Sequence, residues 1–254
     1  MTAVEPYGVA VELDLMPIAA RPELAPLLNT FHGGWPEFMY EDRVAPLYYD
    51  IAHTAFAEYV LVAADPADPT RAAAAAYSVP FTPPQVLPAG GWDAVVVAAI
   101  RDRAAGRRGT QVSALEIMIQ PDLRGRGLAG VVLDAMRRNV ARLGHDTLFA
   151  PVRPNGKDDP AEPMSTYAFR TRADGLPVDP WLRVHVRAGG RIEAVAPQSM
   201  TIAGTLAQWR EWTGLPFDRP GPVHVPKALV PVHCDPDQDT AVYVEPNMWV
   251  RHTL

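Results

Sequence analysis

Leu115-Glu-Ile-Met-Ile-Gln-Pro-Asp-Leu-Arg-Gly-Arg-Gly-Leu-Ala-Gly130 passes from an apolar segment through a proline into a glycine loop, and continues into Val131-Val-Leu-Asp-Ala-Met136. The apolar residues over 112–119 predict a strand. Those over 128–143 repeat at helical spacing, with arginines away from the apolar stripe, and predict an amphipathic helix. The order is therefore strand, tight turn, helix.

This turn has the properties of an anion site. The first N–H groups of a helix have no partner within the helix, and the helix dipole favours negative charge there. Glycines at 125 and 127 remove side chains that would block a close approach of an anion to the backbone. Arg124 and Arg126 add positive charge nearby. The expected ligand is a phosphate or pyrophosphate.

The rest of the chain alternates strand and helix patterns. Helices are expected over 21–31, 41–56, 93–105, 179–189 and 205–214. Strands are expected over 9–15, 59–64, 71–79, 147–152 and 191–205, with a closing hairpin formed by 223–233 and 240–251. A long loop rich in proline and aspartate is expected over 153–178, where a binding loop or lid is typical. This alternation places the chain in the α/β or α+β class with a mixed sheet.

Composition and net charge limit the classes of function that the sequence allows. The chain has 254 residues and a net charge of −6 without a basic stripe, which argues against nucleic acid as a partner. Cys234 is the single cysteine, so no intrachain disulfide forms, and we expect it to be chemically idle. Residues 1–14 have no basic, apolar signal-peptide pattern, and no apolar run is long enough to span a membrane. A cytoplasmic protein without membrane or metal binding is expected.

Arg124-x-x-Gly127-x-Ala129, placed after a strand and a proline, resembles motif A of the GNAT (Gcn5-related N-acetyltransferase) superfamily, R/Q-x-x-G-x-G/A. The resemblance implies a GNAT fold: a mixed, mostly antiparallel sheet flanked by helices, here with an extended C-terminal β hairpin. It also implies acetyl-CoA, or another acyl-CoA, as co-substrate. The strand end Ile117, Met118 and Ile119 would receive the pantetheine arm and the acetyl carbonyl. The pyrophosphate loop would be Arg124, Gly125, Arg126, Gly127, Leu128, Ala129 and Gly130. Asn155 would lie near the cofactor.

A second segment, 179–192, resembles motif B of the same superfamily, in which a helix ends in Tyr-x-x-x-Gly-Phe. Gly189 takes the place of the glycine, so His185 stands where the family has the tyrosine that protonates the leaving thiolate. Histidine, with an ordinary pKa near 6.5, could perform the same step. The alternative is that His185 has no catalytic role and is only a structural residue of the core or the surface.

The acceptor amine must lose a proton, which requires a base. Glu116 lies on the motif A strand and is the expected catalytic base, although it could instead pair with an arginine across the sheet. Glu37 and Glu41 are alternatives. The first two helices line the acceptor site in the GNAT fold. The expected substrate-binding residues are Trp35, Glu37, Tyr40 and Tyr167, and Tyr167 is also the substitute acid. Aromatic residues at such spacing more often belong to the core.

The favoured interpretation is one GNAT-like domain over 1–254, with a core of about 55–205 and a C-terminal extension over 206–254. It would move acetyl to a small-molecule amine by direct attack, because no Ser or Cys nucleophile arrangement is visible. A homodimer is left open.

Three alternatives remain. The Asp179-Pro-x-Leu-Arg-x-His185 run resembles the GNAT-like loading domains of polyketide synthases, which decarboxylate or transfer acyl thioesters with a carrier protein. Their partner threonine is absent from 147–152, where Ala150 and Pro151 stand, and this argues against decarboxylation. The long loop over 153–178 could accommodate a longer acyl group. A catalytically silent CoA-binding module is the third alternative.

Overall fold

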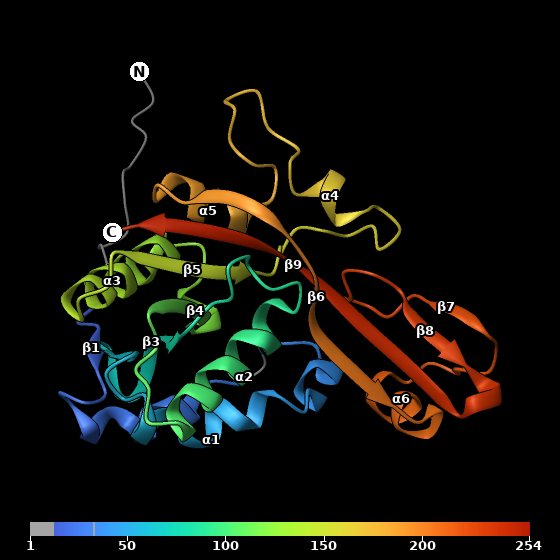
Figure 1. The fold of residues 1–254 in the computed structure, drawn as a ribbon, viewed down its shortest axis with the longest axis horizontal. Coiled ribbons are helices and arrows are strands. Elements are labelled where there is room, and N and C mark those ends of the chain that lie inside the picture. The colour runs from blue at the N-terminus through green and yellow to red at the C-terminus, as the bar shows by residue number, and fades with distance from the viewer. Residues whose placement is uncertain (1–12, 33) are drawn as a thin grey trace.

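The computed structural model describes residues 13–32 and 34–254 (Figure 1). The strands are β1 (Met16–Pro17), β2 (Val60–Asp65), β3 (Asp68–Phe81), β4 (Gln111–Ile119), β5 (Thr147–Val152), β6 (Arg191–Gly204), β7 (Gly221–Val223), β8 (Val232–Asp235) and β9 (Thr240–Thr253). The α-helices are α1 (Ala45–Ala55), α2 (Gly91–Ala104), α3 (Leu128–Arg142), α4 (Met164–Tyr167), α5 (Pro180–Arg187) and α6 (Leu206–Thr213). The 3₁₀ segments are η1 (Pro22–Thr30), η2 (Glu37–Glu41), η3 (Pro121–Leu123) and η4 (Pro236–Gln238).

One mixed sheet runs through the molecule in the order β1-β2-β3-β4-β5-β9-β8-β7, and β6 also pairs with β9. The pairs are antiparallel except for β4 with β5, which run parallel. That parallel pairing joins Val112 to Leu148 and Ser113 to Phe149, and the two strands part beyond these residues. The sheet therefore opens between the C-terminal half of β4 and β5.

Helices cover both sides of the opened sheet (Figure 1). On one side α2 packs against β3 and β6 and contacts α1, and on the other α3 packs against β3, β4 and β5 and contacts α5. Residues 72–79 of β3 are all buried, as expected for a strand covered on both faces. The alanines over 72–76 have small side chains, which allow the two helical layers to lie close to this strand.

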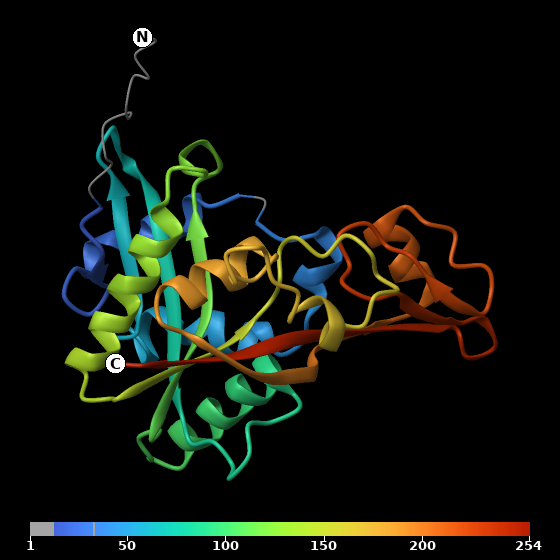
Figure 2. The same cartoon turned by 90° about the horizontal axis from the view of Figure 1, so that it is seen from above.

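The C-terminal part of the chain extends the sheet away from this core (Figure 2). The long strand β9 pairs with β5 through residues 248–253, with β6 through 241–251, and with β8 through 240–242. Its far end carries β7, β8 and α6. Trp209 of α6 anchors this extension, because its ring is buried and its Nε1 donates to the Ala241 carbonyl at 2.8 Å.

Most predicted elements are confirmed, including the strand over 112–119, the helix from Leu128 and the strand over 147–152. Asp179 caps α5 by accepting from the N–H groups of Trp181 and Leu182, and Thr205 forms the predicted capping box with Gln208. Among the described residues, no helix has the length and apolar character needed to cross a bilayer.

Three predictions need correction, and a fourth falls largely outside the described residues. The segment over 21–31 forms the 3₁₀ segment η1, because Pro26 within it has no N–H to donate to an α-helical hydrogen bond. The predicted helix over 41–56 begins only at Ala45, after Asp42 Oδ1 accepts from the N–H groups of Val44 and Ala45.

The predicted strand over 9–15 falls largely outside the described residues, and its last three residues precede β1 without strand structure. The predicted strand over 223–233 is divided into β7 and β8, with Pro226 and Pro231 in the interval between Val223 and Val232.

Candidate active site

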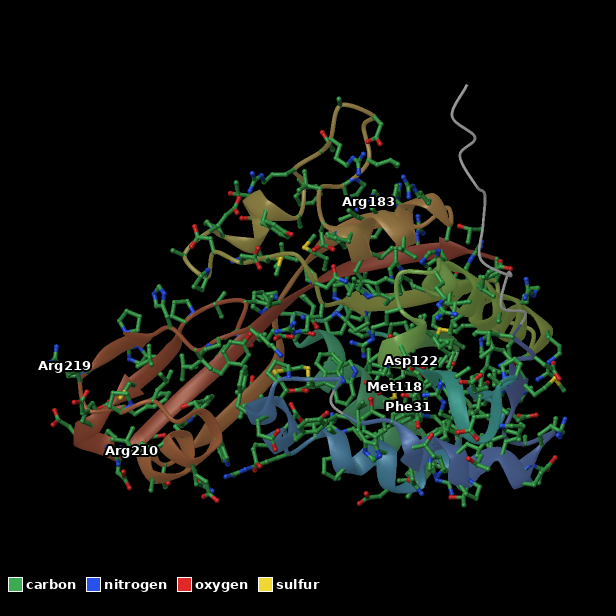
Figure 3. All side chains as sticks on the ribbon, turned by 180° about the vertical axis from the view of Figure 1, so that it is seen from behind. Phe31, Met118, Asp122, Arg183, Arg210 and Arg219 are labelled. Atoms are coloured by element: carbon green, nitrogen blue, oxygen red, sulfur yellow. The ribbon has the colours of Figure 1, made fainter. Side chains whose placement is uncertain are left out.

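A cavity of about 980 Å³ lies where β4 and β5 part. Residues 114–119 of β4 and 150–152 of β5 form two of its walls, and residues of α5 and of the segment before η2 form two others. Phe31 and Met118 both line it (Figure 3). The predicted strand end Ile117, Met118 and Ile119 therefore borders the cavity, as does Asn155. The volume is that of a small-molecule or cofactor site.

The glycine loop forms one end of this cavity. Gly125 and Gly127 both have φ of +77°, a backbone conformation that favours glycine, and a Cβ added at either would meet no atom within 4 Å. Gly127 is the N-cap of α3, so the free N–H groups of the first helical turn lie beside open space. Five residues of the predicted pyrophosphate loop line the cavity: Arg124, Gly125, Gly127, Leu128 and Ala129.

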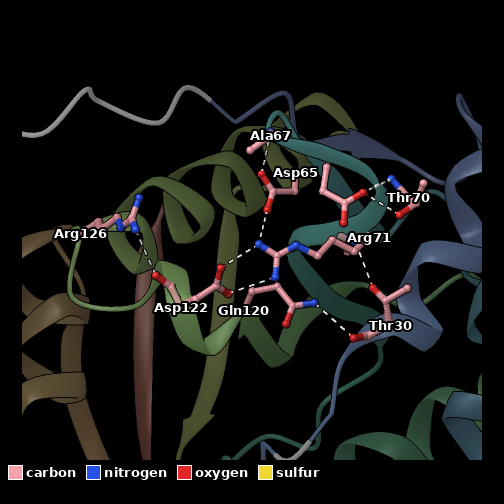
Figure 4. A network of polar contacts seen from close by, with 10 residues as sticks. Thr30, Asp65, Ala67, Thr70, Arg71, Gln120, Asp122 and Arg126 are labelled. Carbon is pink, nitrogen blue, oxygen red and sulfur yellow. Dashed lines mark hydrogen bonds and ion pairs between the residues drawn. The ribbon is translucent and has the colours of Figure 1, made fainter.

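The other two residues of that loop have a different position. Arg126 and Gly130 do not border the cavity, and Arg126 donates to the Asp122 carbonyl at 3.2 Å (Figure 4). The Asp122 carboxylate pairs with Arg71 of β3 at 2.7 Å, and Arg71 also pairs with Asp65 at 2.6 Å. These contacts tie the loop, including Arg126, to the hairpin of β2 and β3.

Glu116 lines the cavity and is held there by two donors from distant parts of the chain. Trp35 Nε1 donates to Oε1 at 2.5 Å, and the Tyr49 hydroxyl of α1 donates to Oε2 at 2.8 Å. The suggested pairing with an arginine across the sheet is therefore wrong. Burial raises the pKa of the Glu116 carboxyl, and the hydrogen bonds from Trp35 and Tyr49 act against this increase. Each oxygen retains a free lone pair for a ligand.

A bulge in β4 sets the direction of the Glu116 side chain. Tyr77 pairs with Glu116 and Ser78 pairs with Ala114, so Leu115 is the extra residue between them. The Leu115 carbonyl accepts from Trp92 Nε1 of α2 at 3.2 Å, and Trp92 also lines the cavity. Sequence patterns alone did not indicate this bulge.

His185 lies on α5 at the cavity wall and is almost fully buried. Its Nδ1 lies 3.0 Å from Nε2 of His252, which belongs to β9, and the Trp181 ring packs edge-on at 4.5 Å. Burial, together with His252, lowers the pKa of His185 to about 3. This value lies well below the reference value near 6.5, so the surroundings of His185 favour its neutral form.

Arg153 is a further cavity residue that the sequence did not indicate. Its Nε donates to Glu245 Oε2 at 2.8 Å, and its guanidinium carbon lies 5.8 Å from the centre of the Trp35 ring. The buried Glu245 also accepts from the Tyr243 hydroxyl and from Asn247 Nδ2. This network fixes Arg153 and Trp35 relative to one another.

Three predicted substrate-binding residues do not border the cavity. Glu37 lies on η2, outside the lining. The Tyr40 side chain is largely exposed at 53%. The Tyr167 hydroxyl donates to Asp179 Oδ2 at 3.0 Å and therefore buttresses the cap of α5. Trp35 is the one member of the predicted set that lines the cavity.

Cys234 lies on β8, is buried in the protein core and does not line the cavity. Burial raises the pKa of its thiol. We expect Cys234→Ser to retain near-normal turnover, because no reacting group is removed. Steady-state kinetics on the purified variant, with its melting temperature, test this. A loss beyond about tenfold, or about 1.4 kcal/mol in barrier, in a stable variant would indicate a covalent mechanism.

Comparison with known proteins finds a curated relative that aligns over nearly the whole chain, and several proteins of similar structure. No protein-family model matches the chain. The chain is 32% identical over 272 aligned residues to arginine N-acetyltransferase avaD of Aspergillus versicolor, an alignment that covers 95% of this chain and 94% of the relative.

Two solved structures show the same fold. The loading GNATL domain of CurA from Lyngbya majuscula matches with a TM-score of 0.60 and 19% identity, and covers 95% of this chain and 98% of its own. The GphF GNAT-like decarboxylase in complex with isobutyryl-CoA matches with a TM-score of 0.54 and 15% identity, over 95% and 98% of the two chains.

Proposed function

Because this chain belongs to the GNAT superfamily and is an N-acetyltransferase, we propose that it moves the acetyl group of acetyl-CoA to a nitrogen of arginine or a closely related basic metabolite. The single observation that carries this proposal is Glu116, a carboxylate held by Trp35 and Tyr49 at the opening of the sheet. A carboxylate attracts a cationic acceptor, and the nearby indole rings of Trp35 and Trp92 suit a guanidinium or ammonium group.

Coenzyme A would occupy the side of the cavity formed by the glycine loop. The N–H groups at the start of α3 would hold its pyrophosphate, with Arg124 beside them. The pantetheine arm would follow β4 through residues 117–119, where β5 no longer supplies backbone partners. The thioester would then reach the gap between the strands, close to Glu116 and the wall formed by α5.

The reaction removes two protons from the acceptor nitrogen. An ammonium group must first lose a proton to become a neutral amine. Glu116 is suited to take that proton, because burial raises the pKa of its carboxyl. The amine nitrogen then attacks the acetyl carbonyl directly, and the second proton ends on the sulfur of coenzyme A. Direct transfer requires only positioning and proton transfer, in agreement with a cavity that contains no cysteine.

The alternative of acyl-thioester decarboxylation is less well supported. The similar loading-domain and decarboxylase structures are below 25% identity, so the likeness concerns the fold. On β5 the cavity is lined by Ala150, Pro151 and Val152, none of which carries a hydroxyl group.

Thiol release in the presence of acetyl-CoA and a panel of acceptors tests the proposal. We expect release to depend on arginine-type acceptors, and mass spectrometry to find one acetyl group on the acceptor nitrogen. Lysine and agmatine are compared with arginine as related basic acceptors. Longer acyl-CoAs replace acetyl-CoA to test which acyl group is transferred. Release of carbon dioxide from malonyl-CoA, or transfer only to a carrier-protein thiol, would contradict the proposal. No thiol release with any acceptor would indicate a silent binding module.

A further inference from the structure

Arg153 presents a guanidinium group to the cavity from the segment that follows β5. Its side chain is 17% exposed and lines the cavity, whereas its ion-pair partner Glu245 is fully buried and does not line it. The guanidinium therefore lies between the Glu245 carboxylate and the cavity. On the cavity side, the group has no carboxylate partner among the described residues.

The hydrogen-bond donors of Arg153 are only partly used. A guanidinium group has five N–H groups. Nε donates to Glu245 Oε2 at 2.8 Å, and Nη2 donates to the Lys227 carbonyl at 2.7 Å. Nη1 makes no hydrogen bond within the described residues and is not among their enclosed polar atoms, so it is accessible. Two parallel N–H groups of a guanidinium match the two oxygens of a carboxylate.

Glu116 and Arg153 both contact the indole of Trp35. Trp35 Nε1 donates to Glu116 Oε1 at 2.5 Å, and the guanidinium carbon of Arg153 lies 5.8 Å from the centre of the Trp35 ring. All three residues line the cavity. A ligand that packs against this indole therefore has a carboxylate and a guanidinium within reach of one small molecule.

The other arginine and lysine residues of the cavity do not offer the same site. Lys157 Nζ and Arg183 Nη1 each donate to two backbone carbonyl groups. Arg124 belongs to the glycine loop, and Arg187 and Lys227 are exposed. The cation with free donors beside Trp35 and Glu116 is therefore Arg153.

We propose that Arg153 is a specificity-determining residue that binds the carboxylate of the acceptor, so that the acceptor is an amino acid with a free carboxyl group and not a decarboxylated amine. The proposal rests on the proposed acetyl transfer. Acetyl-CoA has no carboxylate, so the group that pairs with Arg153 belongs to the acceptor. Glu116 attracts the cationic part of the acceptor, and Arg153 attracts the anionic part. Arginine has both charges, whereas agmatine has only the cationic ones.

Matched ligands test the carboxylate without any change in the protein. Argininamide replaces the carboxylate of arginine with a neutral group of similar size, and agmatine lacks the group entirely. Calorimetry on the native protein with bound coenzyme A should show that arginine binds about tenfold more tightly than either compound, or more. This is the scale expected for hydrogen bonds between charged groups. Binding of all three compounds with equal affinity would overturn the proposal.

Arg153→Lys keeps a positive charge beside Glu245 but removes the fork of donors. It should raise the KM for arginine about tenfold or more, and leave the KM values for agmatine and acetyl-CoA within a few-fold of the native ones. Arg170→Lys is the matched control, because Arg170 pairs with Glu162 at 3.2 Å and neither residue lines the cavity. The control should change none of these values.

A purely structural Arg153 predicts a different result. If Arg153→Lys weakens arginine and agmatine equally, or lowers only the melting temperature, Arg153 is merely the counter-ion of Glu245 and the proposal is wrong. If Arg153→Lys does not fold, the double variant Arg153→Met with Glu245→Gln takes its place, because it removes both charges and leaves no buried charge unpaired. The same loss of preference for arginine is expected.

The binding measurement separates this proposal from the proposed function. Calorimetry requires no acetyl transfer, so an absence of turnover would contradict the proposed function alone. If arginine does not bind, lysine and cadaverine form the corresponding pair of amino acid and decarboxylated amine. No preference for the amino acid in either pair would overturn the role of Arg153, whether or not acetyl transfer is found.

Discussion

Gly127→Asp is expected to weaken coenzyme A binding about a hundredfold or more, or about 2.7 kcal/mol. Gly127 is the N-cap of α3, and a side chain there would project into open space beside the free N–H groups of the first turn. The aspartate carboxylate would occupy those donors and repel the pyrophosphate. Isothermal titration calorimetry with coenzyme A measures the effect.

Backbone strain must be separated from charge in this experiment. Aspartate tolerates a left-handed backbone better than most residues, so strain should contribute the smaller part. Gly144→Asp is the matched control: Gly144 has φ of +87°, has open space at its Cβ, and follows the other end of α3. We expect the control to cost a similar amount of stability and none of the affinity. Unchanged binding in Gly127→Asp would remove the glycine loop from the cofactor site.

Glu116→Gln is expected to reduce kcat/KM for the acceptor by about 10²- to 10³-fold, the range of a lost acid–base group. The amide oxygen of glutamine can still accept from Trp35, and its NH2 group can donate to the Tyr49 hydroxyl oxygen, so the cavity should keep its shape. What it loses is the charge that attracts a cation and the ability to take a proton. Steady-state kinetics at saturating acetyl-CoA measure this, and coenzyme A affinity should remain nearly constant.

The pH dependence provides a second measurement on the same variant. The ionised form of Glu116 is the active one, and burial raises the pKa of its carboxyl. Activity of the native enzyme should therefore decline as the pH falls, at a higher pH than the ordinary value near 4.3 would give. Glu116→Gln should lack this acid limb. Glu37→Gln is the control, because Glu37 lies outside the cavity. Equal losses in both variants would argue against a role for Glu116.

Local patterns predicted the elements that form the glycine-loop end of the cavity. The strand, loop and helix over 112–143 are consecutive in the chain, so their apolar spacing and glycines specify them without reference to distant residues. The cap at Asp179 and the end of α5 before Gly189 are similarly local, and the structure has both. The structure differs from the predicted helices in two places. Prolines make the first segment the 3₁₀ segment η1, and hydrogen bonds to Asp42 precede the later start of α1.

The part of the cavity around Glu116 and His185 could not be predicted in this way, because segments that are distant in sequence form it. Glu116 lies 81 residues from Trp35 and 67 from Tyr49 in sequence, and 67 residues separate His185 from His252. The spacing of apolar residues along the sequence does not indicate such long-range contacts. The resemblance places Tyr40 near the acceptor, and the long loop suggests Tyr167, whereas Tyr40 is exposed and Tyr167 supports Asp179.

The place of β9 in the sheet has a consequence for how the protein forms during synthesis. β9 is the last strand to leave the ribosome among those described, yet it lies between β5 and β6. Until residues 240–253 have been translated, the edge of β5 has no partner on that side, and His185 has no His252 to meet. Such late, long-range pairing slows folding and leaves strand edges open to other chains. Nascent chains should therefore depend on chaperones most while β9 is still incomplete.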